Sequence, residues 1–254
     1  MRPPCVLTCL AVAALAGAVS AGAQTRLGGN ITATPVSGPV PRLADGKPDM
    51  TGVWLRRDGV GSVAQLLPKG ETMPLLPEAK KIMEAHRTNE DPQANCLPIS
   101  TPPRTAPYPF RIVTTPTHTF FLYEVMHEFR QVFMDGRKHP APEELENNWH
   151  GHSIGWWEKD TLVVDSVGFN DKTWFDNNGH PHSDKMHTIE RYTRTALGTM
   201  TIDITIDDPG AYSRPFTLRA TANLMPGAEL MEYICSENNQ DVPYLTGPAI
   251  RGPQ

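Results

Sequence analysis

Proline constrains the fold of this chain more than any other residue type. There are 25 prolines in 254 residues, about twice the usual ~5% share. Proline lacks a backbone N–H and fixes φ, so it interrupts helices and central strands. The excess gathers at residues 32–48, 92–116 and after 242. This distribution argues against a bundle of long helices and leaves the intervening segments free for a sheet.

Short apolar and β-branched runs separated by turn residues indicate strands in the segments between the prolines. The turns are short, as at Asp135-Gly136 and Pro226-Gly227, and the helices that a parallel sheet needs as crossovers are missing. We therefore expect antiparallel pairing. The expected strands are residues 51–56, 110–114, 119–125, 127–134, 151–157, 161–167, 187–194, 200–206, 217–224 and 229–235.

Nine or ten such strands favour closure into a barrel, because closure removes the exposed sheet edges. The sequence predicts an all-β fold, an antiparallel meander barrel in a single domain over residues 49–242. One short helix is expected at about 75–88, where Pro77 suits the first turn and apolar residues can form one stripe. The proline-rich residues 92–116 are expected to form a loop, and 243–254 a tail.

The first 23 residues have the pattern of a secretory signal peptide. Arg2 precedes an apolar run at 9–20, and Ala21-Gly22-Ala23 supplies small residues for cleavage. The run is short for a membrane span, although an uncleaved anchor is the alternative. We expect cleavage near Ala23, a flexible proline-rich lead-in at 24–48 that wraps the barrel, and a periplasmic or secreted protein without a membrane span in the mature chain.

The cysteines fit an exported protein. Cleavage leaves only Cys96 and Cys235, an even pair in an oxidising compartment. We expect them to form a disulfide, and two separate buried thiols are the alternative.

Charge and missing motifs narrow the function classes. Acidic residues number 28 against 23 basic ones, with no basic cluster, so a nucleic-acid partner is not expected. The chain has no glycine-rich phosphate loop and no Gly-x-Ser-x-Gly motif. Nucleotide chemistry and serine hydrolysis are therefore poorly supported, and a small-molecule ligand or substrate is the favoured partner.

Histidines suggest a divalent metal site. All but one of the nine lie between residues 118 and 187, and two pairs have His-x-His spacing. On a strand this spacing places both imidazoles on one face, where they can bind Zn²⁺ or Cu²⁺. Asp184 or Glu190 could add a ligand or orient one. The alternative is a set of surface and structural histidines. The expected metal ligands are His150, His152, His182 and His187.

The same region supports a metal-free acid–base interpretation. Glu124, His127 and Arg130 lie close together in sequence and, with His150, are the expected catalytic residues. Arg130 would hold an anionic or carbonyl oxygen of the substrate. A structural ion pair between Glu128 and Arg130 is the alternative.

Aromatic side chains near these polar groups could form the walls of a ligand pocket. Trp149 and Trp174 flank the two His-x-His segments. With Tyr123 and Phe129 they are the expected ligand contacts, although core packing is the alternative for tryptophans in this region.

An ordered set of motifs resembles a family of exported proteins from soil and aquatic bacteria that are generally described as hypothetical. The resemblance implies a lipocalin-like (calycin-type) barrel and no established activity. Gly52-x-Trp54 is also similar to the lipocalin opening motif, in which the tryptophan plugs the closed barrel end. The motifs are TGVW at 51–54, DPQANCLP at 91–98, YPF at 108–110, EFRQ at 128–131, MDGR at 134–137, GHSIGW at 151–156, DTLVV at 160–164, GFN at 168–170, ERY at 190–192 and EYIC at 232–235.

Together these observations predict an exported barrel that acts on a small organic molecule by proton transfer. Lyase, isomerase and hydrolase reactions all fit, with or without a metal. The alternative is a non-catalytic carrier of an apolar ligand or a metal ion in the same cavity, and an envelope interaction protein ranks last.

Overall fold

The computed structural model describes residues 36–59, 61–87, 90–99, 102–104, 106–235 and 237. These residues belong to one compact unit, Ala33–Gln254, and a second unit, Met1–Thr32, lies outside them. The predicted signal peptide at 1–23, the first part of the lead-in at 24–48 and the tail at 243–254 also lie outside the described residues.

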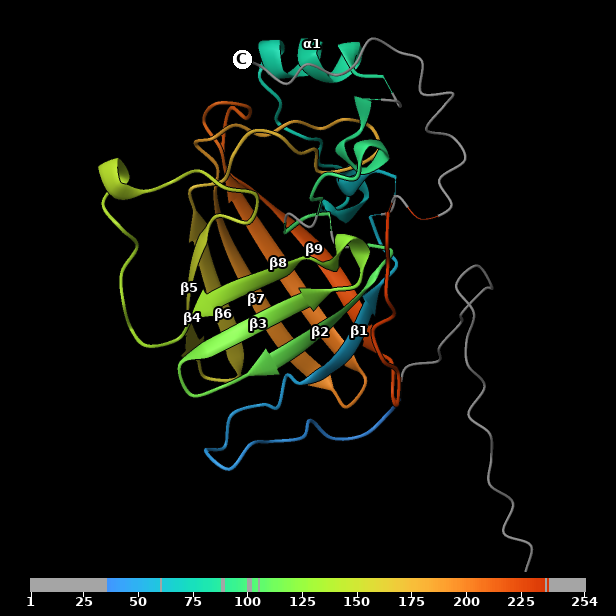
Figure 1. Cartoon of the computed structure of the whole chain (residues 1–254), viewed down its shortest axis with the longest axis vertical. Helices are drawn as coiled ribbons and strands as arrows, with labels where there is room; N and C mark the ends of the chain where they lie inside the picture. The colour runs from blue at the N-terminus through green and yellow to red at the C-terminus, as the bar shows by residue number, and fades with distance from the viewer. Residues whose placement is uncertain are drawn as a thin grey trace, which may run out of the picture. The chain divides into compact units, whose positions relative to one another are not determined.

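The described residues form a closed β-barrel of nine strands (Figure 1). Each strand pairs with the next along the chain, and β1 closes the barrel against β9, with Trp54 opposite Leu224. The prediction of an all-β barrel is confirmed. The strands are β1 Gly52–Arg56, β2 Pro109–Thr114, β3 His118–Tyr123, β4 Phe129–Phe133, β5 His152–Glu158, β6 Thr161–Val167, β7 His187–Ala196, β8 Thr199–Asp207 and β9 Phe216–Leu224.

One pair of strands differs from the predicted antiparallel meander. β4 and β5 are parallel, with Val132 opposite Ser153 and Phe133 opposite Ile154, whereas the other pairs in the barrel are antiparallel. A parallel pair needs a connection that returns the chain to the end where it started. Residues 134–151 provide that connection, which we had expected to contain a tight turn at Asp135-Gly136.

Two expected strands also change at the end of the barrel where β3 leads into β4. The run predicted at 127–134 begins only at Phe129, because Val125–His127 form a 3-10 turn with left-handed Met126 and His127. The run predicted at 229–235 is not a strand. We call residues 229–235 the C-terminal strap. Its Met231 and Tyr233 N–H groups bond side chains of the β3–β4 turn instead.

The predicted helix is present but shorter. Helix α1 spans Pro77–Ala85, with Pro77 in its first turn, and the backbone is already extended at His86. Only Ala79 of this helix is buried, and Ile82 is 52% exposed. Three-residue and four-residue 3-10 turns, η1 Val63–Leu66, η3 Pro92–Asn95 and η5 Pro142–Glu144, lie in the connections.

Trp54 on β1 is fully buried. Its indole N–H donates to the Met50 carbonyl at 3.1 Å, and the Arg194 guanidinium lies 5.0 Å from the ring centroid. Residues 36–48 run across one end of the barrel (Figure 1), where the Leu197 N–H donates to the Gly38 carbonyl. The described part of the proline-rich lead-in therefore wraps that end.

A buried ion pair crosses the barrel interior, which is otherwise largely apolar. Arg130 on β4 donates to Glu190 on β7 at 3.0 Å, and their side chains are 1% and 0% exposed. The guanidinium also donates to Ser153 on β5 at 3.0 Å and to Ser166 on β6 at 2.6 Å. Tyr192 donates its hydroxyl proton to the same carboxylate. The desolvated charges are thus paired and hydrogen-bonded, as buried charges must be.

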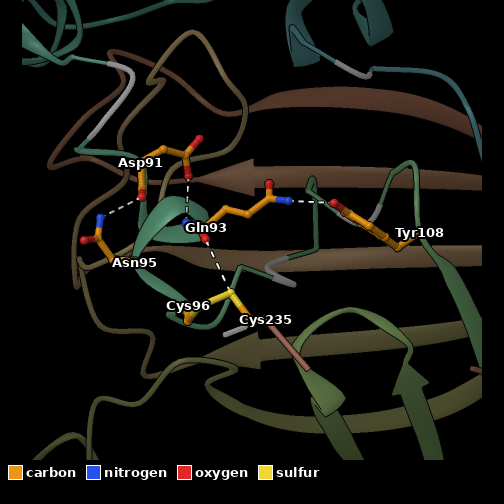
Figure 2. The surroundings of a disulfide bond; sticks show 6 residues. All are labelled: Asp91, Gln93, Asn95, Cys96, Tyr108 and Cys235. Carbon is orange, nitrogen blue, oxygen red and sulfur yellow. Dashed lines mark hydrogen bonds between the residues drawn. A yellow bond between two sulfur atoms is a disulfide. The ribbon is translucent and has the colours of Figure 1, made fainter. Parts of the chain in front are cut away.

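The predicted disulfide between Cys96 and Cys235 is confirmed (Figure 2). It links the C-terminal strap to the end of η3, across a sequence separation of 139 residues. A closure of this length stabilises a fold by about 4–5 kcal/mol in the chain-entropy account. The strap is therefore held covalently against the loops of the open barrel end.

Replacing Glu190 by Gln should test how much the barrel depends on its interior pair. We expect the free energy of unfolding to fall by about 3–5 kcal/mol, because Arg130 would stay buried without a counter-charge. The matched control is Asp203→Asn, which breaks the exposed pair with Arg219 and should change stability little. Urea unfolding followed by tryptophan fluorescence measures both, and equal midpoints would contradict the expectation.

Candidate functional site

Loops cover the strand ends at the barrel end where helix α1 lies (Figure 1), and residues of these loops line a cleft. Its volume is about 190 Å³, below the ~300–1,000 Å³ of pockets for drug-sized ligands. Polar and apolar groups both contribute to its wall. The lining residues are Gly59, Gly61, Gln93, Pro103, Arg104, Ala106, Pro107, Tyr108, Phe175, Asp176 and Asn177.

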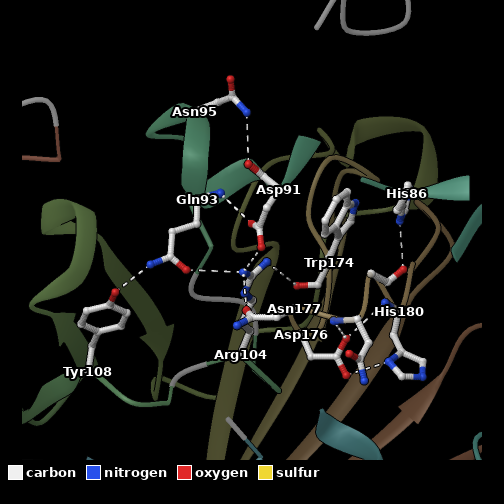
Figure 3. A network of polar contacts seen from close by, with 12 residues as sticks. His86, Asp91, Gln93, Asn95, Arg104, Tyr108, Trp174, Asp176, Asn177 and His180 are labelled. Atoms are coloured by element: carbon white, nitrogen blue, oxygen red, sulfur yellow. Dashed lines mark hydrogen bonds and ion pairs between the residues drawn. The ribbon is translucent and has the colours of Figure 1, made fainter. Parts of the chain in front are cut away.

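Arg104 holds the loops around this cleft together (Figure 3). Its side chain is 4% exposed, and its guanidinium donates to the Asp91 carboxylate at 2.6 Å. It also donates to Asn177 Oδ1 at 3.2 Å and to the Trp174 carbonyl at 3.5 Å. The loop at 91–95 is thereby joined to the loop at 174–180. Gln93 continues the network by donating to the Tyr108 hydroxyl at 2.7 Å.

Asp176 also lines the cleft and is fixed by several donors. It accepts from His180 Nδ1 at 2.6 Å, from Val63 N at 2.8 Å and from Asn178 N at 3.0 Å. Burial raises the pKa of Asp176, but the hydrogen bond and charge of His180 and the backbone donors outweigh it and hold the pKa below its usual value. Asp176 is therefore ionised at neutral pH.

A carboxylate–imidazole pair lies at the same barrel end, where β3 passes into β4. His150 Nε2 is 3.0 Å from Glu128 Oε2, and Glu128 Oε1 accepts from Ile99 N at 2.9 Å. The imidazole stacks on Tyr123, with ring centroids 6.0 Å apart. His150 Nδ1 is buried and has no hydrogen-bond partner among the described residues. One imidazole nitrogen of the pair is thus buried without a hydrogen-bond partner among the described residues.

The four residues expected to be catalytic do not meet around this pair. Arg130 lies in the barrel interior with Glu190, so it does not form the alternative ion pair with Glu128. Glu124 Oε2 accepts from Met231 N at 2.9 Å, and His127 is exposed and accepts from Tyr233 N at 2.9 Å. Of the four, only His150 belongs to this pair, and its partner is Glu128.

The four histidines expected to bind a metal are also distributed. His150 pairs with Glu128, and His182 Nε2 lies 2.6 Å from Thr173 Oγ1, stacked on Phe175. Burial lowers the pKa of His182, which favours its neutral form. In the part of the chain that the structure describes, no group of three or more His, Cys, Asp or Glu residues is arranged to hold a metal ion.

His152 and His187 do join one hydrogen-bonded chain, on the outer face of β5–β7. His152 Nδ1 lies 2.8 Å from His139 Nδ1, and His139 Nε2 lies 3.2 Å from Asp165 Oδ1. His187 Nε2 reaches the same oxygen at 2.8 Å. One ring nitrogen of His139 faces His152 and the other faces Asp165. The side chains therefore form a chain of hydrogen bonds and do not converge on one point where a metal ion could bind. Of the other acids considered as ligands, Glu190 pairs with Arg130 and Asp184 is exposed.

The expected ligand-contacting aromatics are likewise separated. Tyr123 is buried at the inner face of β3, and Trp174 is 8% exposed beneath His86, whose ring is stacked at 4.1 Å. Trp149 is half-buried near Lys172, whereas Phe129 is 60% exposed. The cleft residues Gln93, Arg104, Tyr108 and Asn177 were missed. The signal that could have found Gln93, Arg104 and Tyr108 is the clustering of prolines around polar residues at 92–108.

Comparison of the chain with protein-family models, curated proteins and solved structures finds no match. The resemblance to exported bacterial proteins therefore stays a prediction. No helix in the described ranges has the length and apolar character needed to cross a membrane.

The pair Asp165–His187 should be detectable by titration. The hydrogen bond from His187 to Asp165, with the nearby charge of Asp207, raises the pKa of His187. A raised folded-state pKa stabilises the fold fully below the unfolded value of about 6.5, and this contribution is lost as pH rises through the folded pKa. We expect Asp165→Asn to lower the pKa of His187, measured by NMR of its ring protons. Asp203→Asn is the control, and an unchanged pKa in Asp165→Asn would refute the assignment.

Proposed function

We propose that this chain is an exported enzyme that catalyses proton transfer on a small organic molecule at the open end of the barrel. Lyase, isomerase and hydrolase reactions share this step. The observation that carries the proposal is the Glu128–His150 pair, 3.0 Å apart, with His150 Nδ1 lacking a partner among the described residues.

The chemistry follows from the donor and acceptor roles of the two groups. Ionised Glu128 can only accept, so His150 Nε2 carries the proton between them and Nδ1 bears the lone pair. Nδ1 then removes a proton from the substrate, and the imidazolium that forms is stabilised by the Glu128 carboxylate. The His150 side chain is 17% exposed, whereas Nδ1 itself is buried, so the proposed step requires the groups that cover Nδ1 to move aside when substrate enters.

We further propose that the architecture is lipocalin-like and that the protein works outside the cytoplasm. The Trp54–Arg194 contact supports the first point, since a plugging tryptophan is what the Gly52-x-Trp54 motif implies. The Cys96–Cys235 disulfide supports the second, because structural disulfides persist in oxidising compartments.

A carrier without turnover is the second candidate. The observation that favours it is the cleft, because none of its lining residues belongs to the Glu128–His150 pair. If turnover is found and His150→Ala abolishes it while ligand affinity is kept, the enzyme interpretation holds. A ligand that co-purifies with a protein lacking any turnover would favour the carrier.

The general base can be tested with 5-nitrobenzisoxazole, without knowledge of the natural substrate. A base removes the C3 proton of this probe, the N–O bond breaks, and a coloured nitrophenolate bearing a nitrile forms with no other reactant. We expect the wild-type protein to accelerate this opening and His150→Ala to lose about 10²-fold or more of the acceleration. Glu128→Gln should lose part of it, because the amide lacks the charge that stabilises the imidazolium.

The matched control is His118→Ala, which removes a histidine that contacts Thr117 and Phe120. It should keep the wild-type rate. Circular dichroism and thermal unfolding confirm that each variant is folded. Equal rates of 5-nitrobenzisoxazole opening for the wild type and His150→Ala would contradict the proposal.

A further inference from the structure

We infer that the cleft at the barrel mouth binds a small neutral molecule rich in hydroxyl groups, of the monosaccharide class. The site is separate from the proposed general base, because neither Glu128 nor His150 lines it. The inference therefore goes beyond the proton-transfer proposal and stands without it.

Local charges in the cleft select against ionised ligands. The Arg104 guanidinium is already paired with Asp91 at 2.6 Å, and the Asp176 carboxylate is occupied by His180 and backbone donors. Arg104 and Asp176 are the charged residues among those that line the cleft, so an ionised ligand would have to compete with Asp91 or His180 for its counter-charge. A neutral ligand leaves both existing pairs intact.

The uncharged polar groups of the cleft match hydroxyl groups, which both donate and accept. Asn177 accepts from Arg104 through Oδ1, and its Nδ2 has no partner among the described residues, so it remains a donor for a ligand. The Tyr108 hydroxyl accepts from Gln93 and is also hydrogen-bonded to Tyr233, so it retains acceptor capacity for a ligand hydroxyl. The amides and the phenol are held in place before any ligand arrives, because Arg104 and Gln93 fix them.

The remaining wall is apolar and suits the C–H face of a sugar ring. Phe175, Pro103, Ala106 and Pro107 supply this surface. Gly61, at φ 87°, has no atom within 4 Å of where a Cβ would lie, so its lack of a side chain leaves that part of the cleft open. The volume of about 190 Å³ favours a single sugar unit over an oligosaccharide.

The test measures binding of D-glucose, D-galactose and D-mannose by saturation-transfer NMR and calorimetry on the full mature chain. Glucuronate and glucosamine serve as ionised analogues that keep the sugar ring. We expect at least one neutral hexose to bind, and more tightly than either ionised analogue. Asn177→Ala and Tyr108→Phe should each weaken binding about five-fold, the usual effect of one lost hydrogen bond.

The matched control is Asn178→Ala, an exposed neighbour whose side chain does not line the cleft and whose backbone bond to Asp176 is kept. It should bind as the wild type does. His150→Ala should also keep affinity, which separates failure of the catalytic proposal from failure of this one. The inference is overturned if no neutral hexose binds at about 20 mM ligand. It is also overturned if an ionised analogue binds more tightly than every neutral hexose, or if the Asn177→Ala and Asn178→Ala variants bind the hexose equally well.

Discussion

The interaction on which the barrel depends is the ion pair between Arg130 and Glu190. It draws one inward side chain from each of four successive strands, because Ser153 and Ser166 complete the shell of the guanidinium. These strands include the parallel pair β4–β5, which is joined by only two register positions. A shift of the β4 register by one residue would turn Arg130 outward and leave Glu190 in the interior without a counter-charge. The pair therefore fixes the register where the sheet itself is weakest.

The open end relies on a second set of polar contacts, since its loops have little regular structure. Arg104 joins the loops at 91–95 and 174–180, and the disulfide joins η3 to the C-terminal strap. Each connection leaves backbone and side-chain polar groups paired, which buried loops require. Because these loops are tied to one another, the cleft between them is preformed, and a ligand need not pay to order it.

The strands were predictable because burial alternates along them, as on β7 and β8, and a period of two is visible in sequence. The parallel pairing of β4 with β5 was not predictable, because the direction of β5 depends on the path of residues 134–151. The C-terminal strap has the composition of a strand, yet the barrel closes through β1 and β9 without it.

The site was harder to predict, because its partners are distant in sequence. His150 and His152 have strand spacing, but left-handed Gly151 lies between them, at φ 65°, and β5 begins only at His152. The two imidazoles therefore find different partners. Glu128 lies two residues from Arg130 and was considered as its partner, since spacing cannot reveal that the Arg130 side chain lies deeper in the barrel. Arg104 lay in a loop whose prolines concealed any periodic pattern.

The closure of β1 against β9 also bears on how the chain folds. Trp54 and Leu224 pair although nearly all of the intervening strands lie between them in sequence, and contacts so distant in sequence form slowly. Cys235 follows β9 directly along the chain, so its approach to Cys96 depends on the same event. Oxidation of this pair during refolding would therefore act as a clock for barrel closure, recording the step at which the last strand reaches the first.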